Sequence, residues 1–233
     1  MSSYPKSLCR RLGRASPALS LTRYLALSLG FAALTVITPA AAQNLMPNGA
    51  FDHPEDPLHG WKVKYTVAGY SGNEKRVSGT QDGARGNVAQ LVASDFYVAN
   101  QGVKMESAPI PFDTAATYRL SIDARTTGPD ARIYLRGYRW RPRVERHDNP
   151  DLDKDLVATY NFGPVNFDGE RSERFSNPAR SWKTGTMEVS PNDMSSTALR
   201  HYQQIDFLVL QVTALRGSGG TLFVDNIKLE RIR

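Results

Sequence analysis

The most distinctive run of side chains in the sequence lies between residues 131 and 140. Arg132, Tyr134, Arg136, Tyr138 and Trp140 alternate with small or apolar residues, so in a β-strand all five point to one face. Aromatic rings stack on the axial C–H surface of pyranose rings, and guanidinium groups bind hydroxyl or carboxylate oxygens with two N–H groups. The row predicts a face for a sugar chain, particularly one with uronate groups, contacted by Tyr134, Arg136, Tyr138 and Trp140. The alternative is a structural ladder of aromatics and arginines beneath an overlying segment.

The same region holds residue types that a polysaccharide lyase uses. A lyase needs a Tyr or His base and an Arg that neutralises the uronate, and Tyr138, Arg139, Arg143 and His147 supply these types. The four histidines of the chain lack metal-ligand spacing. The chain has no Gly-x-Ser-x-Gly elbow, P-loop or dinucleotide fingerprint, and no carboxylate pair stands out as a glycosidase pair. The pattern therefore favours binding over catalysis, so we predict no catalytic residues.

Residues 1–42 predict a secretory signal peptide. Five basic residues and no acidic residue are followed by an apolar run from Tyr24 to Ile37 and then by Ala40-Ala41-Ala42, which is the order of a cleaved leader. The apolar run is shorter than the roughly 20 residues that span a bilayer. We expect cleavage after Ala42 and a secreted or periplasmic protein without stable membrane insertion.

Removal of the leader changes the charge of the chain. Five of the 29 basic residues leave with it and all 23 acidic residues stay, so the mature chain has 24 basic residues and is close to neutral. This balance gives no support for nucleic-acid or membrane-surface binding. The single cysteine, Cys9, also lies in the leader, which leaves residues 43–233 without a disulfide.

The mature chain predicts an all-β antiparallel sandwich in a single domain. Runs of strand-forming residues are separated by Gly, Pro, Asn and Asp clusters. Within 205–214, residues 207–210 are apolar on both faces, which indicates a central strand covered on both sides. Only 192–203 fits a short helix, capped by Asn192 or Asp193. The expected strands are 62–68, 88–93, 102–110, 117–125, 131–140, 184–189, 205–214 and 221–231.

Residues 141–181 interrupt this pattern. The segment is rich in Arg, Asp, Asn and Pro, and a connection of this length in a small domain is functional or disordered. Four aromatic residues, Tyr160, Phe162, Phe167 and Phe175, give it apolar surface to bury. We expect one long inserted loop that forms an ordered flap.

The two ends of the mature chain carry motifs that occur together in one family of domains. Asn44-Leu45 and Asn48-Gly49-Ala50-Phe51-Asp52 open it, followed by Gly60-Trp61, and Val224-Asp225-Asn226-Ile227 closes it. Together they resemble the jelly-roll carbohydrate-binding modules of families four and nine, in the galactose-binding-like superfamily. The resemblance implies that the first and last strands lie side by side, that Trp61 is a packing residue, and that the sheet face binds a polysaccharide or oligosaccharide.

The resemblance also implies a structural calcium ion. In such modules the carboxylates of the opening and closing motifs bind calcium together with main-chain carbonyls, which implicates Asp52, Asp225 and the carbonyl of Ala50. Two carboxylates with carbonyls and water form a feasible set of oxygens for this ion.

Three functions remain open on these grounds. The first is a secreted, non-catalytic protein that binds a glycan on its sheet face. The second is a lyase or hydrolase on the same sandwich with 141–181 as its lid, and the third is a structural or adhesive envelope protein that keeps the fold without the sugar site.

Overall fold

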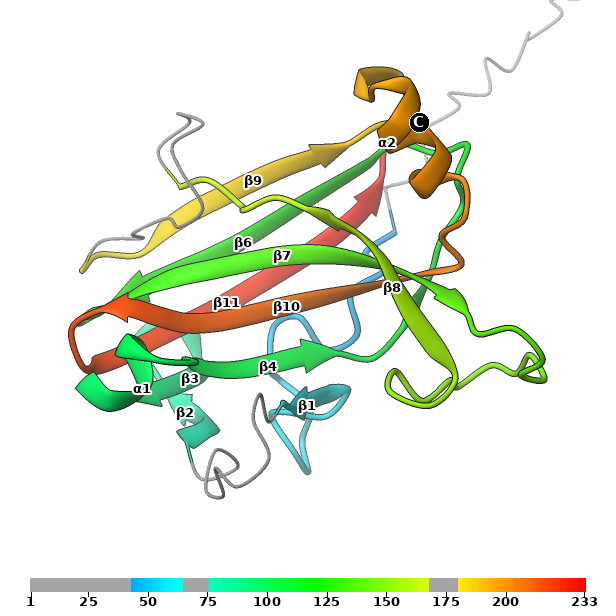
Figure 1. The fold of residues 1–233 in the computed structure, drawn as a ribbon. Coiled ribbons are helices and arrows are strands. Elements are labelled where there is room, and N and C mark those ends of the chain that lie inside the picture. The colour runs from blue at the N-terminus through cyan, green and yellow to red at the C-terminus, as the bar shows by residue number, and fades with distance from the viewer. Residues whose placement is uncertain (1–42, 65–75, 168–179) are drawn as a thin grey trace, which may run out of the picture. The chain divides into compact units, whose positions relative to one another are not determined.

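The computed structural model describes residues 43–64, 76–167 and 180–233, and the predicted signal peptide lies outside these ranges. Most of the regular secondary structure of the domain is in strands, coloured by position in Figure 1. The strands are β1 (Trp61–Val63), β2 (Val77–Gln81), β3 (Asn87–Ala93), β4 (Val103–Ser107), β5 (Ile110–Pro111), β6 (Tyr118–Thr126), β7 (Pro129–Trp140), β8 (Leu156–Phe162), β9 (Lys183–Val189), β10 (Phe207–Gly217) and β11 (Gly220–Arg231).

The strands form two antiparallel sheets that pack face to face. The first, here the β10 sheet, has the order β1-β4-β10-β7-β8 with β5 paired to β10, and the second, the β11 sheet, has the order β2-β3-β11-β6-β9. A single apolar cluster contains buried residues from both sheets, among them Leu135, Leu210, Ile122 and Leu222. The predicted all-β antiparallel jelly-roll sandwich is therefore confirmed.

Alternation explains which side of each strand is buried. In β6, Tyr118, Leu120, Ile122 and Ala124 are buried while the residues between them are half-buried or exposed, as the period of two requires. β10 is central in its sheet, and Val209 on its outward side is fully buried as well. The strand predicted at 117–125 and the covered central strand predicted at 205–214 are therefore both confirmed.

The two ends of the mature chain lie side by side, as the sequence predicts. Asn44 forms a bridge with Glu230, and the backbone N–H of Leu45 donates to the Leu229 carbonyl at 2.8 Å. The opening motif is a turn rather than a full strand. Gly49 meets β11 directly, because its carbonyl accepts a hydrogen bond from Ile227 at 2.9 Å.

The segment 141–181 differs from the expected loop. Residues 156–162 form β8, which pairs with β7 at the edge of the β10 sheet. Phe162 and Phe167 are then buried in the main core, and Asn166 forms a bridge to Thr186 in β9. The second half of the described segment is thus part of the sandwich, because its aromatic residues fill the core between the sheets. Residues 168–179, with Phe175, lie outside the described residues.

Within the described residues, two short α-helices and two 3₁₀ turns connect the strands. The helices are α1 (Asp95–Ala99) and α2 (Ser196–Tyr202), and the 3₁₀ turns cover Gly83–Arg85 and Pro191–Asp193. The α2 cap is Ser195, whose hydroxyl accepts from the Ala198 N–H, so the predicted Asn192 or Asp193 cap is wrong. The intervening 3₁₀ turn, capped by Ser190, moves the helix start along the chain.

Replacement of Gly49 tests the contact between the ends. A Cβ at this position would lie 2.0 Å from the Ile227 carbonyl oxygen, so Gly49→Ala must push the opening turn away from β11. We expect the free energy of unfolding, measured by urea denaturation, to fall by at least about 2 kcal/mol.

The matched control is Gly83→Ala. A Cβ there meets nothing within 4 Å, although the φ of +52° disfavours alanine, so we expect a loss of about 1 kcal/mol. Equal losses in the two variants would contradict the close approach at Gly49.

Candidate functional site

The register of β10 between its neighbours places a polar row on the outward side of the β10 sheet. Gln211 lies opposite Tyr134 of β7 on one side and opposite Glu106 of β4 on the other, and Glu106 lies opposite Lys62 of β1. Paired residues of antiparallel strands point to the same side. Four strands therefore contribute to one row, which the sequence alone did not assemble.

A second row runs beside the first. Thr213 lies between Arg132 of β7 and Lys104 of β4. Within β7, Arg132, Tyr134 and Arg136 are half-buried and alternate with the buried Ala131, Ile133 and Leu135. The predicted common face is confirmed for these three side chains.

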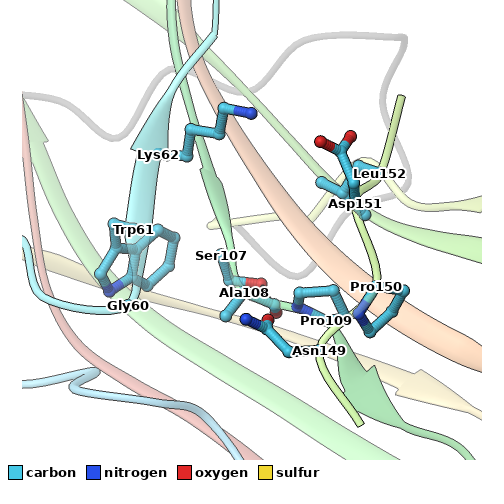
Figure 2. Close-up of a pocket in the computed structure, with 10 residues that line it drawn as sticks. All are labelled: Gly60, Trp61, Lys62, Ser107, Ala108, Pro109, Asn149, Pro150, Asp151 and Leu152. Atoms are coloured by element: carbon cyan, nitrogen blue, oxygen red, sulfur yellow. Dashed lines mark hydrogen bonds between the residues drawn. The ribbon is translucent and has the colours of Figure 1, made fainter. Parts of the chain in front are cut away.

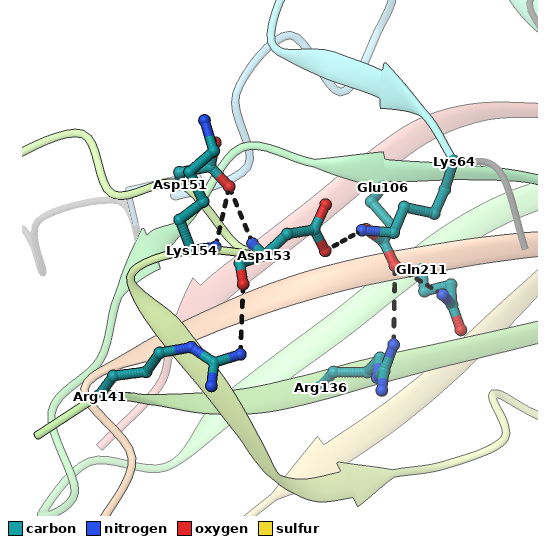
Figure 3. A network of polar contacts seen from close by, with 8 residues as sticks. All are labelled: Lys64, Glu106, Arg136, Arg141, Asp151, Asp153, Lys154 and Gln211. Atoms are coloured by element: carbon teal, nitrogen blue, oxygen red, sulfur yellow. Dashed lines mark hydrogen bonds and ion pairs between the residues drawn. The ribbon is translucent and has the colours of Figure 1, made fainter. Parts of the chain in front are cut away.

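Glu106 is the centre of the face, and Figure 3 shows the side chains that converge on it. It is 1% exposed, and its Oε1 accepts a hydrogen bond from Gln211 Nε2 at 2.6 Å. Arg136 Nη1 lies 3.6 Å from the same oxygen, and Lys64 Nζ lies 3.9 Å from Oε2. Among the described residues, Oε2 has no hydrogen-bond partner. A buried carboxylate needs such cations nearby, because an isolated charge is expensive to bury.

Several cations gather on the face around this carboxylate. Burial lowers the pKa of Lys104, and the nearby charges of Arg132, Arg136 and Lys64 lower it further, while Glu106 opposes the shift. Crowded cations favour a ligand with negative or oxygen-rich groups. Arg136 is held in place by a hydrogen bond from its Nε to the Asn161 side chain of β8 at 3.1 Å.

Tyr138 and Trp140 have a different environment from Tyr134. Tyr138 is 6% exposed and packs with Leu156 and Val209 in a second apolar cluster, to which Trp140 and Phe207 add partly buried rings. Burial raises the pKa of Tyr138 to about 12. A ring this buried offers no face to a sugar, so the assignment of Tyr138 as a sugar contact is corrected to a packing role.

Residues 149–155, here called the strap, cross the outward side of the sheet beside this cluster. Leu152 packs against the cluster, Asp153 forms an ion pair with Lys64, and the Asp153 carbonyl accepts from Arg141 Nη2 at 3.2 Å. The structural ladder beneath an overlying segment is therefore found at the Tyr138 end of β7, while the Tyr134 end lies outside it.

The candidate lyase residues have separate partners. Arg139 donates to the Gln204 side chain at 2.9 Å, and His147 Nε2 lies 3.1 Å from the Asp155 carboxylate with its ring against Trp140. Tyr138 is buried. Tyr138 is therefore not an exposed base, and the Arg139 guanidinium is held by Gln204.

The predicted calcium ligands lie at the other sheet. Asp225 is buried in β11, and Arg85 Nη1 lies 3.1 Å from its Oδ2 and 2.8 Å from Asp123 Oδ2. Asp52 is exposed near Gly86, and Ala50 is exposed in the opening turn. Within 43–64, 76–167 and 180–233, no three His, Cys, Asp or Glu side chains are grouped to hold a metal. The described donors fit an internal guanidinium better than a metal, and calcium binding here stays a prediction.

Arg85 belongs to a layered cluster on the outward side of the β11 sheet. Its guanidinium carbon lies 4.2 Å from the centre of the Trp182 ring, and Trp182 Nε1 donates to Asp82 at 2.8 Å. Burial raises the pKa of Asp225, whereas hydrogen bonds to the ionised form outweigh burial and lower that of Asp123. Without Arg85, two neighbouring carboxylates would lose their common cation.

Arg85→Met is therefore expected to destabilise the domain. The Arg85 side chain is 29% exposed and that of Asp225 is 4% exposed, so we expect a loss of about 2 to 3 kcal/mol in urea denaturation, at or below the usual cost of breaking a buried pair. Arg119→Met is the control, because the Arg119–Glu188 pair is half exposed, and its loss should stay under about 1 kcal/mol.

Thermal melting in calcium and in chelator tests whether a calcium ion, in addition to Arg85, neutralises the carboxylates of this region. A calcium ion that binds only the folded protein increases the free energy of unfolding by roughly 2.7 kcal/mol at a hundredfold excess over its dissociation constant. If the site exists, the unaltered protein should therefore melt at a higher temperature in calcium than in chelator. Identical melting in both conditions would overturn the calcium prediction and leave Arg85 as the counter-ion.

Several residues of the face were missed from the sequence. Lys104 and Glu106 lie in a correctly expected strand and alternate with the buried Val103 and Met105, a signal that two charged residues share its outward side. Their proximity to Arg136 depends on the register across β10, which no local pattern reveals.

Comparisons with known proteins give structural similarities only. No protein-family model matches the chain, and no curated protein matches it significantly. Among solved structures, it is similar to the CBM22-1 xylan-binding domain of Paenibacillus barcinonensis Xyn10C, with 13% identity and a TM-score of 0.47 over 83% of this chain and 97% of that one. A family 4 carbohydrate-binding module is similar at 14% identity and a TM-score of 0.45, over 80% of this chain and 99% of the other.

The arabinose-bound MgGH51 α-L-arabinofuranosidase is similar at 13% identity and a TM-score of 0.46. The match covers 80% of this chain and 26% of the arabinofuranosidase, so the chain spans about a quarter of that enzyme. In the described part of the chain, no helix is long and apolar enough to cross a membrane. The structural neighbours of this sandwich thus include carbohydrate-binding modules at low identity, and function has to be argued from the side chains of the face.

Proposed function

We propose that this protein is a secreted, non-catalytic carbohydrate-binding protein that holds a polysaccharide or oligosaccharide on the outward side of the β10 sheet. The observation that carries the proposal is the row in which Tyr134 and Arg136 lie beside the buried Glu106. The sugar contacts are Tyr134 and Arg136, with Trp140 at the edge of the row.

The chemistry of this row suits a sugar chain. Tyr134 is a half-buried ring on the outward side of β7, with the guanidinium carbon of Arg132 4.8 Å from its centre. Arg136 is oriented by Asn161 and Glu106. Pre-placed rings and hydrogen-bonding groups reduce the ordering cost of binding. Glu106 is buried, so its part is to hold Arg136 in place for a ligand rather than to contact the sugar itself.

The positive charge of the face supports an anionic glycan as the preferred ligand. Four cations, Lys64, Lys104, Arg132 and Arg136, lie near one another on this face, where Glu106 and Asp153 balance part of their charge. Arg pairs well with carboxylates through two parallel hydrogen bonds. A uronate-containing chain supplies both the ring faces and the negative charge that the face favours.

The positions of the candidate lyase residues support binding without bond cleavage. Tyr138 is buried with a raised pKa, and His147 contacts Asp155. The leader predicted over residues 1–42 supports export, which would bring the domain to extracellular or periplasmic glycans.

Native gels cast with neutral or uronate-containing polysaccharides test the proposal. The mature protein should be retarded most by a uronate polymer, and Tyr134→Ala should weaken binding about tenfold, since loss of a stacking ring costs on the order of 1 to 3 kcal/mol. Phe96→Ala is the matched control, because Phe96 is 52% exposed on α1, outside the β10 sheet. It should bind like the unaltered protein.

Arg136→Lys then tests recognition of the carboxylate. Lysine keeps the charge beside Glu106 but loses the planar fork, so we expect weaker binding of the uronate polymer with little change for a neutral one. Full retardation of a Tyr134→Ala, Arg136→Lys double variant would place the site elsewhere. Release of unsaturated or reducing ends from the polymers would show instead that the protein is a lyase or a hydrolase.

A further inference from the structure

A cavity of about 230 Å³ lies between β1, the end of β4 and the strap. Figure 2 shows Trp61 on one side of it and Pro109 and Pro150 on the other, with Lys62 and Asp151 at its rim. Of the polar row across the four strands, Lys62 lines this cavity, whereas the proposed sugar contacts Tyr134, Arg136 and Trp140 do not. Its walls nevertheless combine an aromatic ring, apolar surface and a few polar groups, the composition usual for small-ligand sites.

Trp61 forms a fixed wall of the cavity. Its Nε1 donates to the Asn48 carbonyl at 3.3 Å, and its ring lies 5.5 Å from that of the fully buried Phe51. The packing role predicted for Trp61 is thus present, and because the residue is only half-buried, part of its surface remains for a ligand. A ring held on one side and open on the other loses little freedom when it binds.

The opposite wall is equally constrained. The Asp151 carboxylate accepts from the backbone N–H groups of Asp153 and Lys154 at 2.9 and 3.2 Å, and these hydrogen bonds lower its pKa. The Asp151 N–H donates to the Asp155 carboxylate at 2.7 Å. The strap therefore presents Asp151 as an ionised acceptor of fixed direction.

Size and charge restrict what the cavity can hold. An apolar cavity of about 150 Å³ admits benzene, so 230 Å³ is enough for one six-membered sugar ring with its hydroxyl groups. Lys62 and Asp151 bring opposite charges to the rim, and the rest of the wall is uncharged. A neutral, hydroxylated ring fits this balance better than an anionic one.

The cavity adjoins the sugar row. Lys62 of β1 lies opposite Glu106 of β4, and Lys64, two residues along, contacts both Glu106 and Asp153 of the strap. A glycan on the sheet face would therefore bring a terminal or branching sugar to this point.

We propose that the cavity between Trp61 and the strap is a separate subsite that binds one neutral pyranose residue, at the end or on a branch of the glycan held by the sheet face. The inference rests on the proposed function for its biological ligand. The cavity itself is tested with single sugars, which do not need the sheet face.

The experiment is a titration of ¹⁵N-labelled mature protein with methyl glucoside, methyl galactoside, methyl mannoside and sodium glucuronate. The Trp61 indole N–H signal, assigned from Trp140→Phe and Trp182→Phe variants, and the Asp151 amide signal should shift with at least one neutral glycoside. A dissociation constant on the order of 1 mM is expected for a ligand of this size. Glucuronate should bind more weakly.

Two kinds of variant check the position of the subsite. Ala108→Phe fills the cavity, and Asn149→Ala removes an exposed amide at its rim, so the first should abolish binding of the glycoside and the second should weaken it severalfold with the fold unchanged. Ala115→Phe, at an exposed position outside the lining, should leave it unaltered. Absence of shifts at Trp61 and Asp151 with all three neutral glycosides, or unaltered glycoside binding in Ala108→Phe, would overturn the inference.

Native gels with the polysaccharides separate this inference from the proposed function. Glycoside binding that disappears in Ala108→Phe, without retardation of the unaltered protein by any polymer, would support the subsite and reject the sheet-face function. Retardation that depends on Tyr134, without any glycoside effect at Trp61, would reject the subsite and keep the sheet-face function.

Discussion

The antiparallel register of β10 between β4 and β7 is the constraint on which both the core and the candidate site depend. It places Leu208, Leu210 and Val212 in the core and turns Val209 and Gln211 outward. A slip of one residue would exchange these two sets, exposing the core residues and burying the polar ones. The register is thus selected by burial, and the polar row across four strands is a consequence of it.

Glu106 gives this row its electrostatic character. A carboxylate at 1% exposure on the side away from the core has to be compensated locally. Gln211 of β10, Arg136 of β7 and Lys64, which follows β1, provide the compensation. Lys104 and Arg132 add further cations to this face, while Asp153 balances part of the charge through Lys64. The same group that organises the polar side chains therefore leaves a positively charged face, suited to oxygen-rich and anionic ligands. On the opposite sheet the balance is reversed, because Arg85 lies between the carboxylates of Asp123 and Asp225.

Local patterns were sufficient for most of the fold. The strict alternation of 117–125, the apolar run of 205–214 and the closing motif predicted strands that the structure contains, whereas the opening motif forms a turn. β2 was missed because Val77–Gln81 contains glycine and small polar residues, and β8 because Leu156–Phe162 follows a Pro- and Asp-rich stretch. In β8 the decisive signal is tertiary, since the strand is held by its pairing with β7.

The site was predictable only in part for the same reason. Alternation in β7 correctly placed Arg132, Tyr134 and Arg136 on one face. It could not reveal that the strap covers Tyr138, because that contact joins segments distant in the chain and depends on where Leu152 and Leu156 pack. Nor could it find Glu106 or the cavity at Trp61, which are made by several strands together.

A crystal structure of the mature protein with an oligosaccharide from the polymer that retards it most tests the central claim most directly. The account predicts sugar rings against Tyr134, with a carboxylate or hydroxyl oxygen within hydrogen-bond distance of Arg136 and close to Glu106. A ligand bound instead on the outward side of the β11 sheet, beside Trp182 and Arg125, would contradict it.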